Sequence, residues 1–195
     1  SKANLDLPNI DPVEGAARSE LGVGIHLTND QPLAIEYSAA KTTRNLPPVP
    51  NRQLDAHGYV YEVKPKTTNP IDANAPLDQA VKDELAAAIN DSQLPSVAKT
   101  NLKRRLGKKE TLSKFFDDAD EVIQKVFVDN GLEYPEEAAL DLQRRVTQNL
   151  RSNLEVDSIL YRADVEGQTF DQLTVLGRPD SFEVSNVTPS TESTT

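Results

Sequence analysis

The sequence predicts an α+β fold with a small helical core of about four helices over residues 77–154. Short β-hairpin elements are expected on either side of this core, together with extended Pro-rich and Ser/Thr-rich arms. Nine of the thirteen prolines lie within residues 1–76, and proline disfavours helix because it lacks an amide donor and restricts the preceding residue. After residue 76, apolar residues recur at steps of three and four, which is the helical period.

The N-terminal third of the chain is predicted to be mostly extended. Alternation of polar and apolar residues is typical of half-buried strands. It occurs in three short stretches, 23–27, 33–37 and 59–63. A turn at Asn29-Asp30 would join the first two into a hairpin, and Pro65 would end the third. We therefore expect an extended N-terminal arm over 1–20 and a Pro-rich extended or β segment over 21–76, whose last part, 66–76, is a linker.

The helical core is assigned to residues 77–155 and contains the strongest pattern in the chain. The predicted helices span 77–90, 96–106, 111–130 and 135–154. The third carries an apolar stripe that includes three of the five phenylalanines, and Asn130-Gly131 supplies a left-handed helix stop. Its opposite face is expected to be solvated. That face consists of Lys114, Asp117, Asp118, Glu121, Lys125 and Asp129.

Beyond the helical core the pattern returns to strands. Stretches 158–162 and 173–176 predict two strands around a turn at Glu166-Gly167, and 181–184 predicts a last short strand. Residues 156–184 are therefore assigned to a small β element. The remaining residues, 185–195, are mostly polar and lack aromatic residues, which predicts a C-terminal tail that does not order itself alone.

Composition excludes several classes of function. The chain has no cysteine, so disulfides, thiolate zinc sites, iron–sulfur clusters and thiol catalysis are excluded. A net charge of −10 disfavours wrapping of nucleic acid and attachment to anionic membranes. No apolar run is long enough to span a bilayer, and the N-terminus lacks the pattern of a signal peptide. A virion location is expected, or otherwise a cytoplasmic one.

The sequence contains no recognisable catalytic motif. His26 and His57 are the only histidines, and neither stands in a metal-binding pattern. The G-x-S-x-G and G-x-x-x-x-G-K-[ST] patterns are both missing. We therefore expect a protein that is not an enzyme and has no cofactor and no metal. A metal-free hydrolase around either histidine is a minor alternative.

The sharpest chemical feature is a basic cluster at the start of the helical core. Its candidate partner-binding residues are Lys99, Lys103, Arg104, Arg105, Lys108 and Lys109. They lie on a short helix and a glycine turn, an order similar to a helix-turn-helix unit, which would suit phosphate. An acidic protein surface is an alternative partner, and so is the acidic run 117–121 of a neighbouring copy. A solvated helix face is the plainest interpretation.

Isolated apolar residues in the extended segments are a second candidate surface. These residues are Leu5, Leu7, Ile10, Val13, Leu46 and Val49. Proline-rich arms gain little from folding on themselves, so they act either as linkers or as strips that lie along another protein. In the second case, these side chains would fill pockets on the partner.

The layout of arms, helical core and polar tail resembles that of minor or accessory virion proteins of bacteriophages, such as cement, scaffold-like or connector subunits. The resemblance implies a non-enzymatic structural protein whose arms attach it to capsid or other assembly subunits, or to copies of itself. The alternative is a small nucleic-acid-binding regulator that uses the stretch 96–114. No membrane partner is expected.

Overall fold

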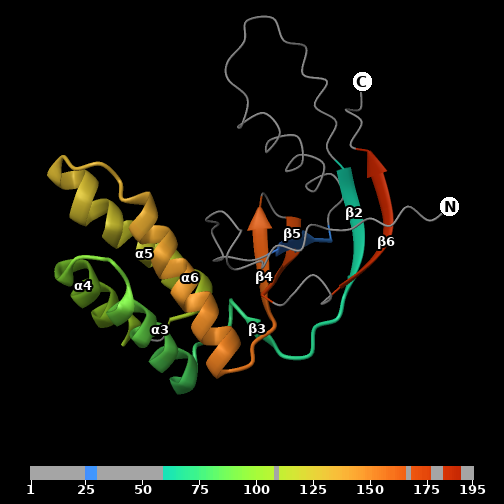
Figure 1. The fold of residues 1–195 in the computed structure, drawn as a ribbon, viewed down its shortest axis with the longest axis horizontal. Coiled ribbons are helices and arrows are strands. Elements are labelled where there is room, and N and C mark those ends of the chain that lie inside the picture. The colour runs from blue at the N-terminus through green and yellow to red at the C-terminus, as the bar shows by residue number, and fades with distance from the viewer. Residues whose placement is uncertain (1–24, 30–58, 108–109, 166–167, 177–181, 190–195) are drawn as a thin grey trace, which may run out of the picture.

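A computed structural model describes residues 25–29, 59–107, 110–165, 168–176 and 182–189 (Figure 1). These residues form a mixed α+β structure with four α-helices and six strands in two small sheets, which confirms the predicted class. Figure 1 shows the helices gathered on one side of the molecule and the strands on the other. The elements are, in order, β1 (Ile25–Thr28), β2 (Tyr59–Pro65), β3 (Pro70–Asp72), α3 (Gln79–Asp91), α4 (Ser96–Leu106), α5 (Leu112–Phe127), the 3₁₀ turn η1 (Val128–Asn130), α6 (Glu136–Asn153), β4 (Ser158–Val165), β5 (Gln168–Val175) and β6 (Phe182–Pro189).

Local capping sets the limits of α3 and α5. The Asp78 carboxylate accepts a hydrogen bond from the amide of Val81 (2.8 Å) at the start of α3. At the start of α5, the Thr111 hydroxyl accepts one from the amide of Lys114 (3.2 Å). Both are N-cap contacts that satisfy an amide with no partner inside the helix. After η1 the chain leaves the helix at Gly131 with φ of 76°, which confirms the predicted left-handed stop.

One apolar core joins the helices to the larger sheet. Phe115 and Phe116 of α5 are 1% and 4% exposed, and their rings meet edge to face with centroids 5.6 Å apart. In the helical half, α3 packs on α6 and α4 packs on α5. The same contiguous core includes Ile159 of β4 and Leu176, directly after β5. Helices and sheet therefore exclude water together.

The larger sheet has the strand order β1-β5-β4-β3. β4 and β5 form the predicted hairpin, with Val165 opposite Gln168 at its end. β1 pairs antiparallel with β5, and the expected partner stretch 33–37 lies outside the described residues. β3 lies parallel to β4 within the segment predicted to be a linker. The linker prediction was wrong at residues 70–72, because pairing with β4, nearly ninety residues later, orders them.

The smaller sheet consists of β2 and β6, paired antiparallel. β6 extends through Pro189, beyond the predicted strand 181–184 and into the segment predicted to be a tail. β2 also continues to Pro65. The polar residues after Val184 are ordered because β2 supplies backbone hydrogen-bond partners, a cause that composition does not reveal.

Backbone hydrogen bonds connect the larger sheet to the helices at residues 73–77. The Ala73 amide donates to the carbonyl of Leu160 in β4 (2.8 Å), and the Ala73 carbonyl accepts from the amide of Ser113 in α5 (3.0 Å). Close by, the Leu77 amide donates to the carbonyl of Glu110 (2.9 Å). We call this set of three hydrogen bonds the joint.

None of the described helices is both long enough and apolar enough to cross a membrane. Nothing in the described residues bears on the predicted virion location.

The core position of Phe115 gives a first test of the structure. Phe115→Ala should lower the free energy of unfolding by about 3–5 kcal/mol, because it removes a buried ring and leaves a cavity. Urea unfolding followed by helical circular dichroism measures this. Leu132→Ala is the matched control, since Leu132 is 57% exposed and should change stability by less than about 0.5 kcal/mol. Similar losses in the two variants would contradict the assigned core.

Candidate functional site

Charged side chains of α4 and α5 meet at the point where the two helices face each other. Arg105 Nη1 lies 2.5 Å from Asp118 Oδ1 and 2.7 Å from Glu121 Oε2. Lys114 Nζ lies 3.3 Å from the same Asp118 oxygen. The fifth member is Glu110, a buried carboxyl that interacts with Asp118. We call these five residues the carboxyl cluster.

Asp118 is buried, at 5% exposed, so its prediction as part of a solvated face was wrong. It follows Phe115 by three positions and precedes Val122 by four, which places it on the apolar side of α5. Burial alone would raise the pKa of Asp118, but its hydrogen bonds with Glu110 and Arg105 outweigh burial and lower the pKa. The helical period predicts that Asp118 lies on the apolar side of α5, but its charge led to its assignment to the solvated face.

Glu110 is the residue that sequence reasoning missed. In the sequence it is a single acid among basic residues, and in the structure it is 2% exposed. Its Oε2 atom has no hydrogen-bond partner among the described residues. Burial and then the hydrogen bond to Asp118 raise the pKa of Glu110 to about 7, so this carboxyl holds a proton well above the usual range.

The outer part of the carboxyl cluster is solvent-exposed. Hydrogen bonds from Arg105 and then Lys125 lower the pKa of Glu121 to about 2. The contact with Glu121 also raises the pKa of Arg105, although burial opposes this shift. Arg105 is thus held charged between a buried carboxylate and an exposed one. Arg105 thereby links α4 to α5.

The structure divides the predicted basic cluster. Arg105 is engaged with α5, and Lys99 Nζ donates to the carbonyl of Asn90 (2.7 Å). Lys103 and Arg104 are exposed, and Arg104 donates to Asn101 Oδ1 (3.1 Å). The last two predicted residues, Lys108 and Lys109, lie outside the described residues. Among the described members, two exposed cations remain on the surface of α4.

The structure describes only one of the other residues singled out in the sequence, His26. His26 belongs to β1, opposite Thr174 of β5. His57 and all six apolar residues proposed to contact a partner lie outside the described residues. Those six are Leu5, Leu7, Ile10, Val13, Leu46 and Val49.

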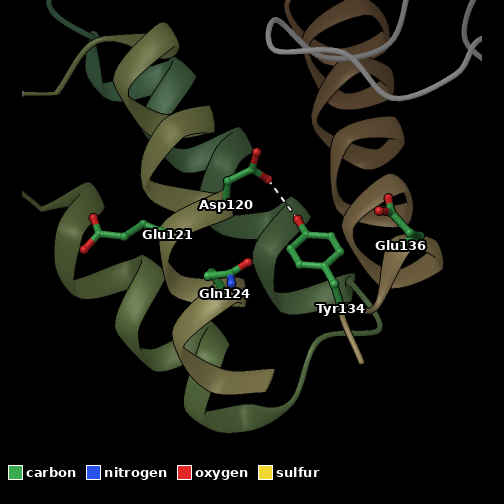
Figure 2. A pocket seen from close by; sticks show the side chains of 5 residues that line it. All are labelled: Asp120, Glu121, Gln124, Tyr134 and Glu136. Carbon is green, nitrogen blue, oxygen red and sulfur yellow. Dashed lines mark hydrogen bonds between the residues drawn. The ribbon is translucent and has the colours of Figure 1, made fainter. Parts of the chain in front are cut away.

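Two open depressions are present on the described surface. The first, of about 360 Å³, is lined by Asp120, Glu121, Gln124, Tyr134 and Glu136. Figure 2 shows Asp120 and Tyr134 pointing toward each other, and the Tyr134 hydroxyl donates to Asp120 (3.0 Å). The second, of about 290 Å³, is lined by Asp72, Asn74, Leu160, Arg162 and Thr169. In the described part of the chain, no group of three or more acidic or histidine side chains is arranged to hold a metal ion.

The sheet of β2 and β6, which we call the β2–β6 ribbon, is a candidate interaction surface. Figure 1 shows the ribbon on the side away from the helices. Neither outer edge of the ribbon pairs with another described strand. A two-stranded sheet is marginally stable by itself.

The register of the ribbon separates apolar from polar positions. The apolar cross-strand pairs are Tyr59 with Pro189, Tyr61 with Val187, Val63 with Val184 and Pro65 with Phe182. The pairs between them are Val60 with Thr188, Glu62 with Asn186 and Lys64 with Glu183. The cross-strand pairs therefore alternate between apolar residues and mainly polar ones along the ribbon.

A bulge maintains this separation along the whole ribbon. Glu62 pairs with Asn186 and Val63 with Val184, which leaves Ser185 as an extra residue. The Ser185 hydroxyl donates to the carbonyl of Glu62 (3.1 Å). Without the bulge, Val63 would stand opposite Ser185 and Pro65 opposite Glu183. The bulge therefore keeps apolar residues opposite each other on both sides of it.

No protein-family model matches this chain, and no curated protein or solved structure is significantly similar to it.

The carboxyl cluster predicts different effects for two neighbouring arginines. Arg105→Gln should lower the free energy of unfolding by about 1–3 kcal/mol at pH 7, because Asp118 stays buried and loses a charged hydrogen-bond donor. Arg104→Gln is the matched control and should cost less than about 0.5 kcal/mol, since its side chain is exposed. Urea unfolding of both variants measures the difference. Equal losses would show that Arg105 does not hold the cluster.

Proposed function

We propose that this chain is a non-enzymatic structural or interaction protein that attaches to a larger assembly. The specific proposal is a minor or accessory virion protein of a bacteriophage, with a cement-, scaffold- or connector-like role. The extended arm 1–20 would provide part of the attachment. Its partners would be capsid or other assembly subunits, or copies of the chain itself.

The observation that supports this proposal is the β2–β6 ribbon. Apolar residues stand opposite each other in its pairs from Tyr59–Pro189 to Pro65–Phe182, and alternate positions of a strand share one face of a sheet. Apolar sheet faces are stable when another layer covers them. On the polar face, Glu62, Lys64 and Glu183 are exposed. A ribbon that exposes one face to solvent and packs the other face against a partner is suited to attachment to a neighbouring subunit.

The carboxyl cluster adds an argument against catalysis at that position. Two carboxyl groups that share a proton resemble an acid–base pair in their chemistry. However, Glu110 and Asp118 are 2% and 5% exposed, so a substrate atom has no access to the pair. The carboxyl cluster therefore stabilises the fold, and we place the partner-binding surface on the β2–β6 ribbon.

The nucleic-acid alternative depends on the stretch 96–114. Arg105 and Lys114 are engaged with Asp118, which leaves Lys103 and Arg104 as the exposed described cations of α4. Few phosphate contacts produce weak binding with a shallow salt dependence. We therefore keep the nucleic-acid regulator as the alternative to the proposed attachment to protein.

Association with particles tests the proposal. The chain should co-purify with phage particles on a density gradient, and Val63→Glu should reduce its incorporation at least about tenfold, because a charge would be buried against the partner. Glu62→Gln is the matched control on the polar face and should incorporate normally. Quantitative mass spectrometry of the particles measures both. A chain absent from particles, or equal incorporation of both variants, would contradict the proposal.

Deletion of residues 1–20 separates the contribution of the arm from that of the ribbon. Incorporation should fall while the helical circular dichroism of the free chain is unchanged. In a parallel experiment, titration with duplex DNA should show weak binding that Arg104→Ala barely changes. A steep salt dependence that this variant abolishes would instead favour the nucleic-acid regulator.

A further inference from the structure

Glu110 occupies a buried position at the joint between the helices and the sheet. Its own carbonyl accepts the hydrogen bond from the Leu77 amide, and Thr111, the next residue, forms a β-bridge with Pro76. Two positions further on, the Ser113 amide bonds to Ala73. The backbone around Glu110 therefore holds segment 73–77, which continues from β3. Displacement of Glu110 would disturb all of these contacts together.

The charged groups that face Glu110 come from two helices. α5 contributes Asp118 and Lys114, and α4 contributes Arg105. On the third side, residues 73–77 contain no titratable side chain. Lys108 and Lys109 precede Glu110 in the chain and lie outside the described residues.

Both described cations of the cluster are committed to Asp118. Arg105 contacts Asp118 at 2.5 Å and Lys114 contacts it at 3.3 Å, whereas no ion pair of the described residues includes Glu110. Its Oε2 atom also lacks a hydrogen-bond partner there. A negative charge on Glu110, in addition to that on Asp118, would therefore be poorly compensated. Movement of residue 110 toward water would lower the free-energy cost of this charge.

We propose that Glu110 is a proton-controlled switch for the joint. With a proton on the Glu110–Asp118 pair, the backbone at residue 110 holds segment 73–77 against the helices. Loss of that proton drives Glu110 outward and releases the Leu77 amide, so that the helical core and the four-stranded sheet become less firmly connected. This inference stands independently of the proposed attachment to an assembly.

The direction of the pH dependence follows from the pKa of Glu110. In the closed joint this pKa is about 7, compared with 4.5 for an ordinary glutamate. Between these two values the closed state binds the extra proton, so its stability relative to the open state falls as the pH rises. Above about pH 7 both states are deprotonated and the dependence levels off. The switch therefore operates between about pH 5 and about pH 7.

Hydrogen exchange of the Leu77 and Ser113 amides tests the switch. In the wild type, the protection factors of these amides should fall by up to about tenfold per pH unit from about pH 5 to about pH 7 and then become constant. Glu110→Gln keeps the shape of the protonated acid and should give protection factors that do not change with pH. Glu137→Gln, at an exposed position on α6, is the matched control and should behave like the wild type.

A second measurement keeps the proposal testable if Glu110→Gln fails to fold. Carbon NMR of the Glu110 side-chain carboxyl in the wild type should show titration near neutral pH, with Leu77 amide exchange changing over the same range. Titration near the ordinary glutamate value would overturn the proposal. Protection factors that follow the same pH course in the wild type and in Glu110→Gln would also overturn it.

Discussion

The two backbone hydrogen bonds of Ala73 are the contact on which the described architecture depends. This residue is fully buried, and its amide and carbonyl are satisfied by Leu160 of the sheet and Ser113 of the helical core, respectively. A buried peptide group that loses its partner is costly, so Ala73 connects both halves directly. The shared core behind it, with Ile159 packed among helical side chains, makes the connection cooperative.

Electrostatics at this connection is arranged around Arg105. One guanidinium serves a buried carboxylate, Asp118, and an exposed one, Glu121, and so part of the basic cluster stabilises the fold rather than the surface. Among the described residues, no cation forms an ion pair with Glu110. An ion pair and a carboxyl with a raised pKa therefore lie side by side, and burial is the main cause of the raised pKa of Glu110.

The sequence was informative where structure is local and less so where it depends on distant partners. The periodicity of α5 and the helix stop at Gly131 could be predicted because both depend on residues that are close in the sequence. β3 and the second half of β6 could not be predicted. Each is ordered by pairing with a distant part of the chain, β3 with β4 at Leu160 and β6 with β2. For the site, the position of Asp118 on the apolar side of α5 follows from the helical period, whereas the backbone at Glu110 is positioned by contacts with residues 76–77, more than thirty positions earlier.

The β2–β6 ribbon also has a consequence for the order of folding. In the sequence, β2 precedes the whole helical core and β6 follows it. Their pairing therefore closes a loop of roughly 120 residues. Helices such as α5 form from contacts a few residues apart, while pairing over this separation is slow unless the intervening chain is already compact. The ribbon should therefore form last, when the finished core has brought residues 59–65 and 182–189 together. During synthesis, β2 emerges long before its partner strand exists.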